Sequence, residues 1–244
     1  CRQNFTTFDA MLPDTFRPCL SSRQTHVSLT PAVGYNLSDE TLHHLLRQGT
    51  AVLKVKIGQP GAEADMVAAD IRRVSAIHEM ARGYETGLTE TGQVVYYLDA
   101  NGRYESVEAL LRLLRHAERI GMLERIVVIE EALVEELAVD VSQVPACLAA
   151  DESLHVAEDV TIRAQQGYGA IAVKAAGKTL SLALEMIQAA DAAGLQPFVA
   201  DNACVPILVD WQWMSSKLIQ PTSSLPICPA SVGMSCQLRS IRTC

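Results

Sequence analysis

Charged residues stand at the ends of short apolar segments, and three of them are acids that could bind a cation. Asp99, Glu130 and Asp151 each close a run of β-branched or small apolar residues. Carboxylate oxygens are the ligands that Mg²⁺ prefers, and this ion keeps coordination positions open for water or substrate oxygens. Each acid alone could equally cap a helix or pair with a lysine. All three together favour a Mg²⁺ site.

Lysines stand at comparable positions on two further segments. Lys54 and Lys56 are two residues apart, so on a strand both would point to the same face. Burial and a neighbouring cation disfavour the ammonium form, so such a lysine could act as a base near neutral pH. Lys174 closes a later apolar run, and lysines on either side of a metal could remove and return a proton on opposite faces. The alternative, an edge strand whose lysines point to solvent, is left open by the apolar pattern.

The elements that would position these residues alternate regularly along the chain. Ser38 and Ser106 are suited to begin helices as N-caps, and Gly194 is suited to end one. Strand-like runs are expected at about residues 26–30, 51–58, 94–99, 126–130, 146–151, 170–174 and 196–201. Helical patterns lie between them at about residues 38–49, 62–82, 106–120, 156–166 and 180–193.

This alternation, with nearly continuous apolar strands, predicts a parallel sheet covered by helices. Seven such units fit a (β/α)₈-type TIM barrel better than an open doubly wound sheet. No Gly-rich phosphate-binding turn follows the first strand, as a dinucleotide-binding fold would require. In a barrel of this kind the active site lies at the C-terminal ends of the strands, where the charged residues would meet.

Both ends of the chain depart from the pattern. Residues 1–24 are predicted to be a linker or remnant, residues 25–211 the barrel domain, and residues 212–244 an irregular tail. After Asp210 the chain has no acidic residue, while prolines, serines and three cysteines gather there. An alternative is that this tail is not the natural continuation, for instance after a reading-frame error. No eighth strand is visible in it, so we expect an incomplete barrel.

Composition narrows the classes of function. The 244 residues carry a formal net charge of −8, which argues against a nucleic-acid-binding surface. No run of eighteen apolar residues occurs, so no membrane span is expected. The seven cysteines are scattered without CxxC spacing and indicate neither a disulfide framework nor a zinc site. A reduced, cytoplasmic protein is expected.

Five short motifs, in order, resemble the enolase superfamily, and most of all its muconate-lactonizing branch with dipeptide epimerases and o-succinylbenzoate synthases. They occupy residues 54–56, 98–101, 129–131, 150–153 and 173–174. The resemblance implies the C-terminal TIM-barrel domain of that superfamily. Family members also carry an N-terminal capping domain, which is not expected in this chain. A strand-seven histidine, typical of the mandelate-racemase branch, is absent, because Asp201 and Asn202 occupy that region.

The resemblance implies that Asp99, Glu130 and Asp151 bind Mg²⁺. The shared reaction step is abstraction of a proton α to a carboxylate, which gives an enediolate. An epimerase, racemase or cycloisomerase acting on a small carboxylate is therefore expected, and a homo-oligomer is also implied. The alternatives are an acid-sugar dehydratase of the same superfamily and a truncated barrel without catalytic activity.

The resemblance also implies roles for the lysines. Lys56 would be the base on one face, assisted by Lys54, and Lys174 the acid or base on the other. Further polar residues at the strand ends would contact the substrate or support the metal ligands, namely Asn101, Glu131, Glu152 and Asp201.

Overall fold

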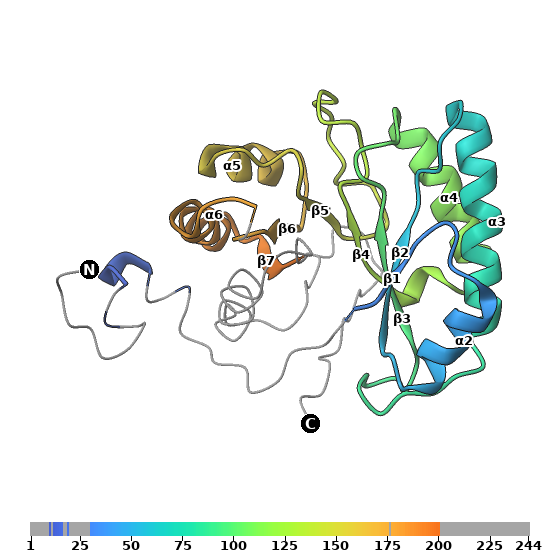
Figure 1. Ribbon diagram of the computed structural model, residues 1–244. Coiled ribbons are helices and arrows are strands. Elements are labelled where there is room, and N and C mark those ends of the chain that lie inside the picture. The colour runs from blue at the N-terminus through green and yellow to red at the C-terminus, as the bar shows by residue number, and fades with distance from the viewer. Residues whose placement is uncertain (1–9, 11, 17–18, 20–29, 176, 201–244) are drawn as a thin grey trace.

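The computed structural model describes residues 10, 12–16, 19, 30–175 and 177–200, and its main feature is one parallel sheet. Each of the seven strands pairs in parallel with the next along the chain, so the strand order is the sequence order. The sheet forms a half-barrel with β1 and β7 at its two edges (Figure 1). The strands are β1 (Ala32–Val33), β2 (Val52–Lys56), β3 (Val95–Asp99), β4 (Ile126–Glu130), β5 (Leu148–Ala150), β6 (Ala170–Val173) and β7 (Gln196–Val199).

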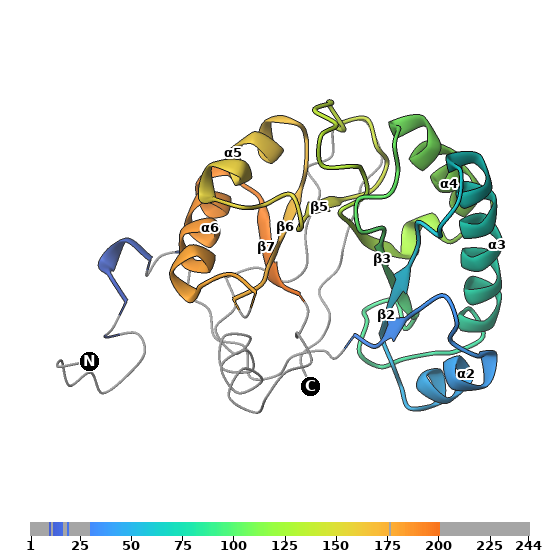
Figure 2. The same ribbon diagram turned by 45° about the horizontal axis from the view of Figure 1, so that its top comes forward.

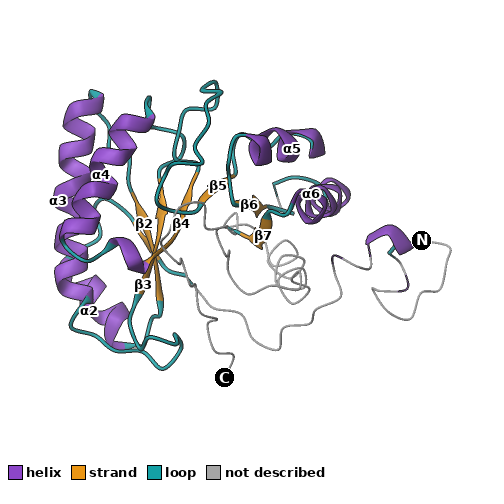
Figure 3. Cartoon of the chain, turned by 180° about the vertical axis from the view of Figure 1, so that it is seen from behind, coloured by secondary structure: helices purple, strands orange, loops and turns teal. Residues whose placement is uncertain are grey.

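Helices cover the outer side of this sheet in two groups. The first three lie outside β1 to β4, and the last two lie outside β5 to β7 (Figure 1, Figure 2). The same two groups flank the strands when the molecule is viewed from behind (Figure 3). The helices are α2 (Asp39–Arg47), α3 (Glu63–Ala81), α4 (Val107–Arg119), α5 (Ala157–Gln165) and α6 (Leu180–Ala193), with short 3₁₀ helices η1 (Asp14–Phe16) and η3 (Leu123–Arg125).

Local sequence signals explain where several helices begin and end. The hydroxyl oxygens of Ser38, Ser106 and Thr179 accept hydrogen bonds from backbone N–H groups in the first turns of α2, α4 and α6. These bonds satisfy donors that have no partner inside the helix. Gly194 ends α6 with φ +73°, a left-handed conformation that glycine adopts without steric cost.

The two faces of the sheet have different cores. The helix-facing side chains of the strands, such as Leu53, Leu98 and Ile129, pack with the helices in one large apolar core. The inner face carries a smaller apolar cluster that includes Val52, Tyr97, Val128, Cys147, Ala149 and Ala170, with Phe198 packed against it. Because side chains alternate along a strand, the polar residues of the inner face follow this cluster toward the C-terminal strand ends.

The predicted architecture is confirmed for the described residues. The first strand was expected at residues 26–30, and the structure has β1 at Ala32–Val33. Residues 26–29 lie outside the described part. Asp201, the tail and most of residues 1–24 are also outside it. The alternative of an exposed edge strand for the lysine pair is wrong, because β2 lies between β1 and β3. No helix in the described ranges has the length and apolar character needed to cross a membrane.

Candidate active site

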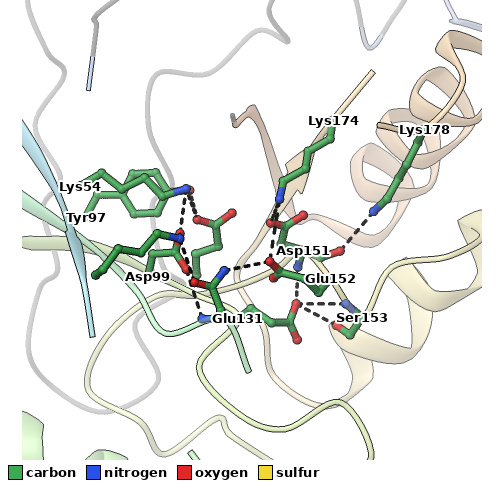
Figure 4. Close-up of polar contacts among 12 residues, drawn as sticks. Lys54, Tyr97, Asp99, Glu131, Asp151, Glu152, Ser153, Lys174 and Lys178 are labelled. Atoms are coloured by element: carbon green, nitrogen blue, oxygen red, sulfur yellow. Dashed lines mark hydrogen bonds and ion pairs between the residues drawn. The ribbon is translucent and has the colours of Figure 1, made fainter. Parts of the chain in front are cut away.

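The charged residues of β2 to β6 meet at the C-terminal ends of the strands. Asp99 and Glu130 are the last residues of β3 and β4, and they stand opposite each other in the parallel ladder. Asp151 directly follows β5, and all three acids are at most 1% exposed. Lys54, Tyr97 and Asp99 lie on one side of the cluster, and Lys174 lies on the other (Figure 4).

Two lysines of β2 hold Asp99. The Nζ atoms of Lys54 and Lys56 lie 2.9 and 2.5 Å from Asp99 Oδ2. Register explains this contact, because Lys56 stands opposite Asp99 in the ladder between β2 and β3. Although burial alone would raise it, the two ammonium groups hold the pKa of Asp99 below its ordinary value.

Glu130 is held through one of its two oxygens. Its Oε2 accepts a hydrogen bond of 2.6 Å from the Tyr97 hydroxyl and lies 2.6 Å from Lys54 Nζ. Its Oε1 is buried and accepts no hydrogen bond from the residues described. Burial raises the pKa of Glu130 to about 9; the carboxyl groups of Asp151 and Asp99 add to the rise, and Lys54 opposes it.

Lysines also reach the acid that follows β5. Lys174 Nζ forms an ion pair with Asp151 Oδ2 and lies 4.0 Å from Glu152 Oε1. Asp151 Oδ1 is buried and, within the described ranges, accepts no hydrogen bond. Lys178 Nζ donates to the backbone oxygen of Asp151 over 3.1 Å, and burial lowers the pKa of Lys178.

Two residues with unusual backbone conformations connect the strand ends. Glu131 has φ +37°, and its Oε2 accepts hydrogen bonds from the backbone N–H groups of Asp151 and Ser153 and from the Ser153 hydroxyl. Asn101 has φ +47°, accepts a hydrogen bond from Lys56 Nζ and donates one to Glu152 Oε1. Glu131 thus fixes the turn after β5, and Asn101 joins the β3 turn to the β5 turn.

The acids fit Mg²⁺ in donor type and burial. Glu130 Oε1 and Asp151 Oδ1 are buried acceptors without donors, which is an unusual and costly state unless something binds there. Among the described residues, however, no group of three His, Cys, Asp or Glu side chains converges closely enough to hold a metal ion. The side chains that contact these acids are lysines: Lys54 and Lys56 contact Asp99, and Lys174 contacts Asp151.

Sequence reasoning missed two residues of this cluster. Tyr97 lies two positions before Asp99, so strand alternation could have placed it on the same inner face. Lys178 follows β6 in an irregular segment, where no periodic pattern predicts the direction of a side chain. Of the predicted residues, Asp201 is outside the described part, and the other nine lie in the contacts given above.

No family model and no curated protein matches the sequence. Among solved structures, a mandelate racemase/muconate lactonizing protein from Herpetosiphon aurantiacus matches with a TM-score of 0.64 and 22% identity, over 84% of this chain and 54% of that one. A mandelate racemase/muconate lactonizing enzyme from Roseiflexus sp. matches with a TM-score of 0.63 and 19% identity, over 86% of this chain and 58% of that one.

A third solved structure is a dipeptide epimerase from Enterococcus faecalis V583, complexed with Mg and the dipeptide L-Leu-L-Tyr. It matches with a TM-score of 0.54 and 20% identity, over 70% of this chain and 46% of that one. The chain thus spans about half the length of these structures. The predicted resemblance is confirmed at the level of the fold: the described part of the chain is an incomplete parallel α/β barrel that matches the barrel of mandelate racemase/muconate lactonizing enzymes.

Proposed function

We propose that this chain carries the active site of an enzyme that abstracts a proton α to a carboxylate group. The reaction would be an epimerisation, a racemisation or a cycloisomerisation of a small carboxylate. The observation that carries the proposal is the placement of lysines from β2 and from the end of β6 on opposite sides of buried acids (Figure 4). Two proton-transfer groups on opposite sides are what inversion at an α-carbon requires.

The acids support this reading because they fit a divalent cation. Asp99, Glu130 and Asp151 would hold Mg²⁺, through hard carboxylate oxygens of the kind that ion prefers. When bound, Mg²⁺ would neutralise the negative charge that develops on the carboxylate oxygens of the substrate, which is an electrostatic contribution that grows toward the transition state.

The exposure of the lysines separates their proposed roles. The side chains of Lys56 and Lys174 are 28% and 21% exposed, so a substrate could reach them, whereas Lys54 is 6% exposed and touches two acids. Lys56 in its amine form would accept the α-proton and become an ammonium group. Lys174 in its ammonium form would give a proton to the opposite face, and the reverse reaction would exchange these roles. Lys54 would contribute positive charge.

Deuterium exchange at the α-carbon tests this proposal. N-acyl amino acids and dipeptides of both configurations would be incubated with the chain and Mg²⁺ in D₂O, and exchange followed by NMR. We expect Lys56→Met to abolish exchange of one configuration and Lys174→Met that of the other, because each lysine serves one face. Arg115→Met, which removes an exposed cation on α4, is the matched control. This variant should still catalyse deuterium exchange of both configurations. Exchange that survives both lysine substitutions would contradict the proposal.

A further inference from the structure

We propose that Tyr97 is a positioning residue for cation binding. Its hydroxyl group, together with Lys54, occupies Oε2 of Glu130 and so leaves Oε1 as the oxygen available to Mg²⁺. This inference rests on the proposed function and deepens the account of the same site. It adds a residue that is neither an acid nor a lysine to the group on which metal affinity depends.

The register of the sheet brings Tyr97 to this place. Tyr97 stands opposite Lys54 on β2 and Val128 on β4, and two residues later Asp99 stands opposite Glu130. Tyr97 is 6% exposed, and its hydroxyl group donates to Glu130 Oε2 over 2.6 Å. Hydrogen bonds to an ionised carboxylate are roughly twice as strong as those between neutral groups, so this contact would strengthen when a bound cation holds Glu130 in its ionised form.

The ring of Tyr97 is fixed by contacts that do not involve its hydroxyl group. Phe198 on β7 meets the ring edge-on, with ring centres 5.7 Å apart and an interplanar angle of 86°. Lys54 Nζ lies 4.8 Å from the ring centre. Replacing Tyr97 with phenylalanine should therefore remove one hydrogen-bond donor and leave the packing of the inner face in place.

The two oxygens of Glu130 are in different environments, and this difference indicates a binding role. Oε2 is contacted by two donors, Tyr97 and Lys54, whereas the buried Oε1 has no donor among the described residues. A buried acceptor without a partner is costly, and such an atom in a folded protein calls for an explanation, which a cation bound at Oε1 would supply. Asp151 Oδ1, on the adjacent strand end, is in the same state.

The adjacent residue provides a matched control. Tyr96 is also buried, but it points to the helix side of β3, where its hydroxyl group lies 2.9 Å from His78 Nδ1. Tyr96→Phe and Tyr97→Phe therefore delete the same group from consecutive residues on opposite faces of one strand. A general effect of losing a buried hydroxyl group would appear in both variants. A specific effect on Mg²⁺ affinity would appear only in Tyr97→Phe.

Isothermal titration with Mg²⁺, on the full chain and both variants, is the test. We expect Kd to rise about 10-fold or more in Tyr97→Phe, because partners that orient metal ligands commonly contribute 10–100-fold in affinity. In Tyr96→Phe the Kd should change less than about twofold, because its hydroxyl group contacts His78 on the opposite face of the strand and orients none of the three acids. Unchanged affinity in Tyr97→Phe would overturn the inference and leave the proposed function standing. A wild-type chain that does not bind Mg²⁺ would overturn both.

A second measurement does not depend on how well the phenylalanine variants fold. 3-Fluorotyrosine would be placed at position 97 or at position 96, and ¹⁹F NMR spectra recorded during Mg²⁺ titration. We expect the signal at position 97 to shift over the concentrations at which Mg²⁺ binds, and the signal at position 96 to stay in place. If the ¹⁹F signal at position 97 does not shift when Mg²⁺ binds, the positioning role is overturned.

Discussion

The site residues form a cluster in which lysines balance buried acids. Lys54 lies within ion-pair distance of both Asp99 and Glu130, while Lys174 contacts Asp151 on the other side. Taking charges out of water is costly, and close partners of opposite sign offset much of that cost. Loss of Lys54 would therefore remove an ammonium group from both Glu130 and Asp99, although Asp99 would keep its contact with Lys56.

Lys54→Met tests this dependence. We expect the free energy of unfolding to fall by about 3–5 kcal/mol without Mg²⁺, because two buried carboxylates lose their shared cation. Added Mg²⁺ should stabilise this variant more than the wild type, because it supplies the missing positive charge. Urea unfolding with and without Mg²⁺ measures both effects. Lys56→Met is the control and should lose less stability, since that side chain is 28% exposed; equal losses in the two variants would contradict the argument.

Between elements, a buried carboxylate on α3 fixes the turns that carry the site. Asp70 accepts hydrogen bonds from the backbone N–H of Gly58, two residues after β2, and from the hydroxyl group of Tyr104, in the segment after β3. Gly58 has φ +77°, and a Cβ atom there would lie 2.9 Å from the backbone oxygen of Ala100. The turn after β2 thus needs glycine both for its conformation and for its close approach to the segment that follows β3.

Gly58→Ala and Gly49→Ala separate these two requirements. Both glycines have positive φ, but a Cβ atom at Gly49 would meet nothing within 4 Å. We expect Gly49→Ala to cost about 1 kcal/mol of unfolding free energy from backbone strain alone. Gly58→Ala should cost about 2–4 kcal/mol, because overpacking adds to the same strain. Chemical denaturation measures both values, and equal losses would show that the close contact with β3 is unimportant.

For the whole molecule, the alternation of strands and helices was predictable, because apolar runs and caps are local signals. The spacing of Lys54 and Lys56 predicted that both lie on one face of β2, and the contacts of Lys54 with Asp99 and Glu130 show that this is the inner face. The side-chain contacts between neighbouring strands could not be predicted with the same accuracy. Strand alternation places Tyr97, and not Tyr96, on the same face as Asp99, but only the register of the folded sheet brings the hydroxyl group of Tyr97 to Glu130. Lys178 lies in a segment without periodicity, so only the folded chain brings it to Asp151.

Catalysis at the strand ends would require first of all that the three acids bind a cation together. The measurement is a thermal melt of the full chain with and without millimolar Mg²⁺, compared with Asp99→Asn and with Glu79→Gln, an exposed acid on α3. A ligand that binds only the folded state stabilises it by about 2.7 kcal/mol at 100 times its Kd. We predict that Mg²⁺ raises the Tm of the wild type and of Glu79→Gln but not of Asp99→Asn. A cooperative melt of the wild type that does not respond to Mg²⁺ would contradict the account.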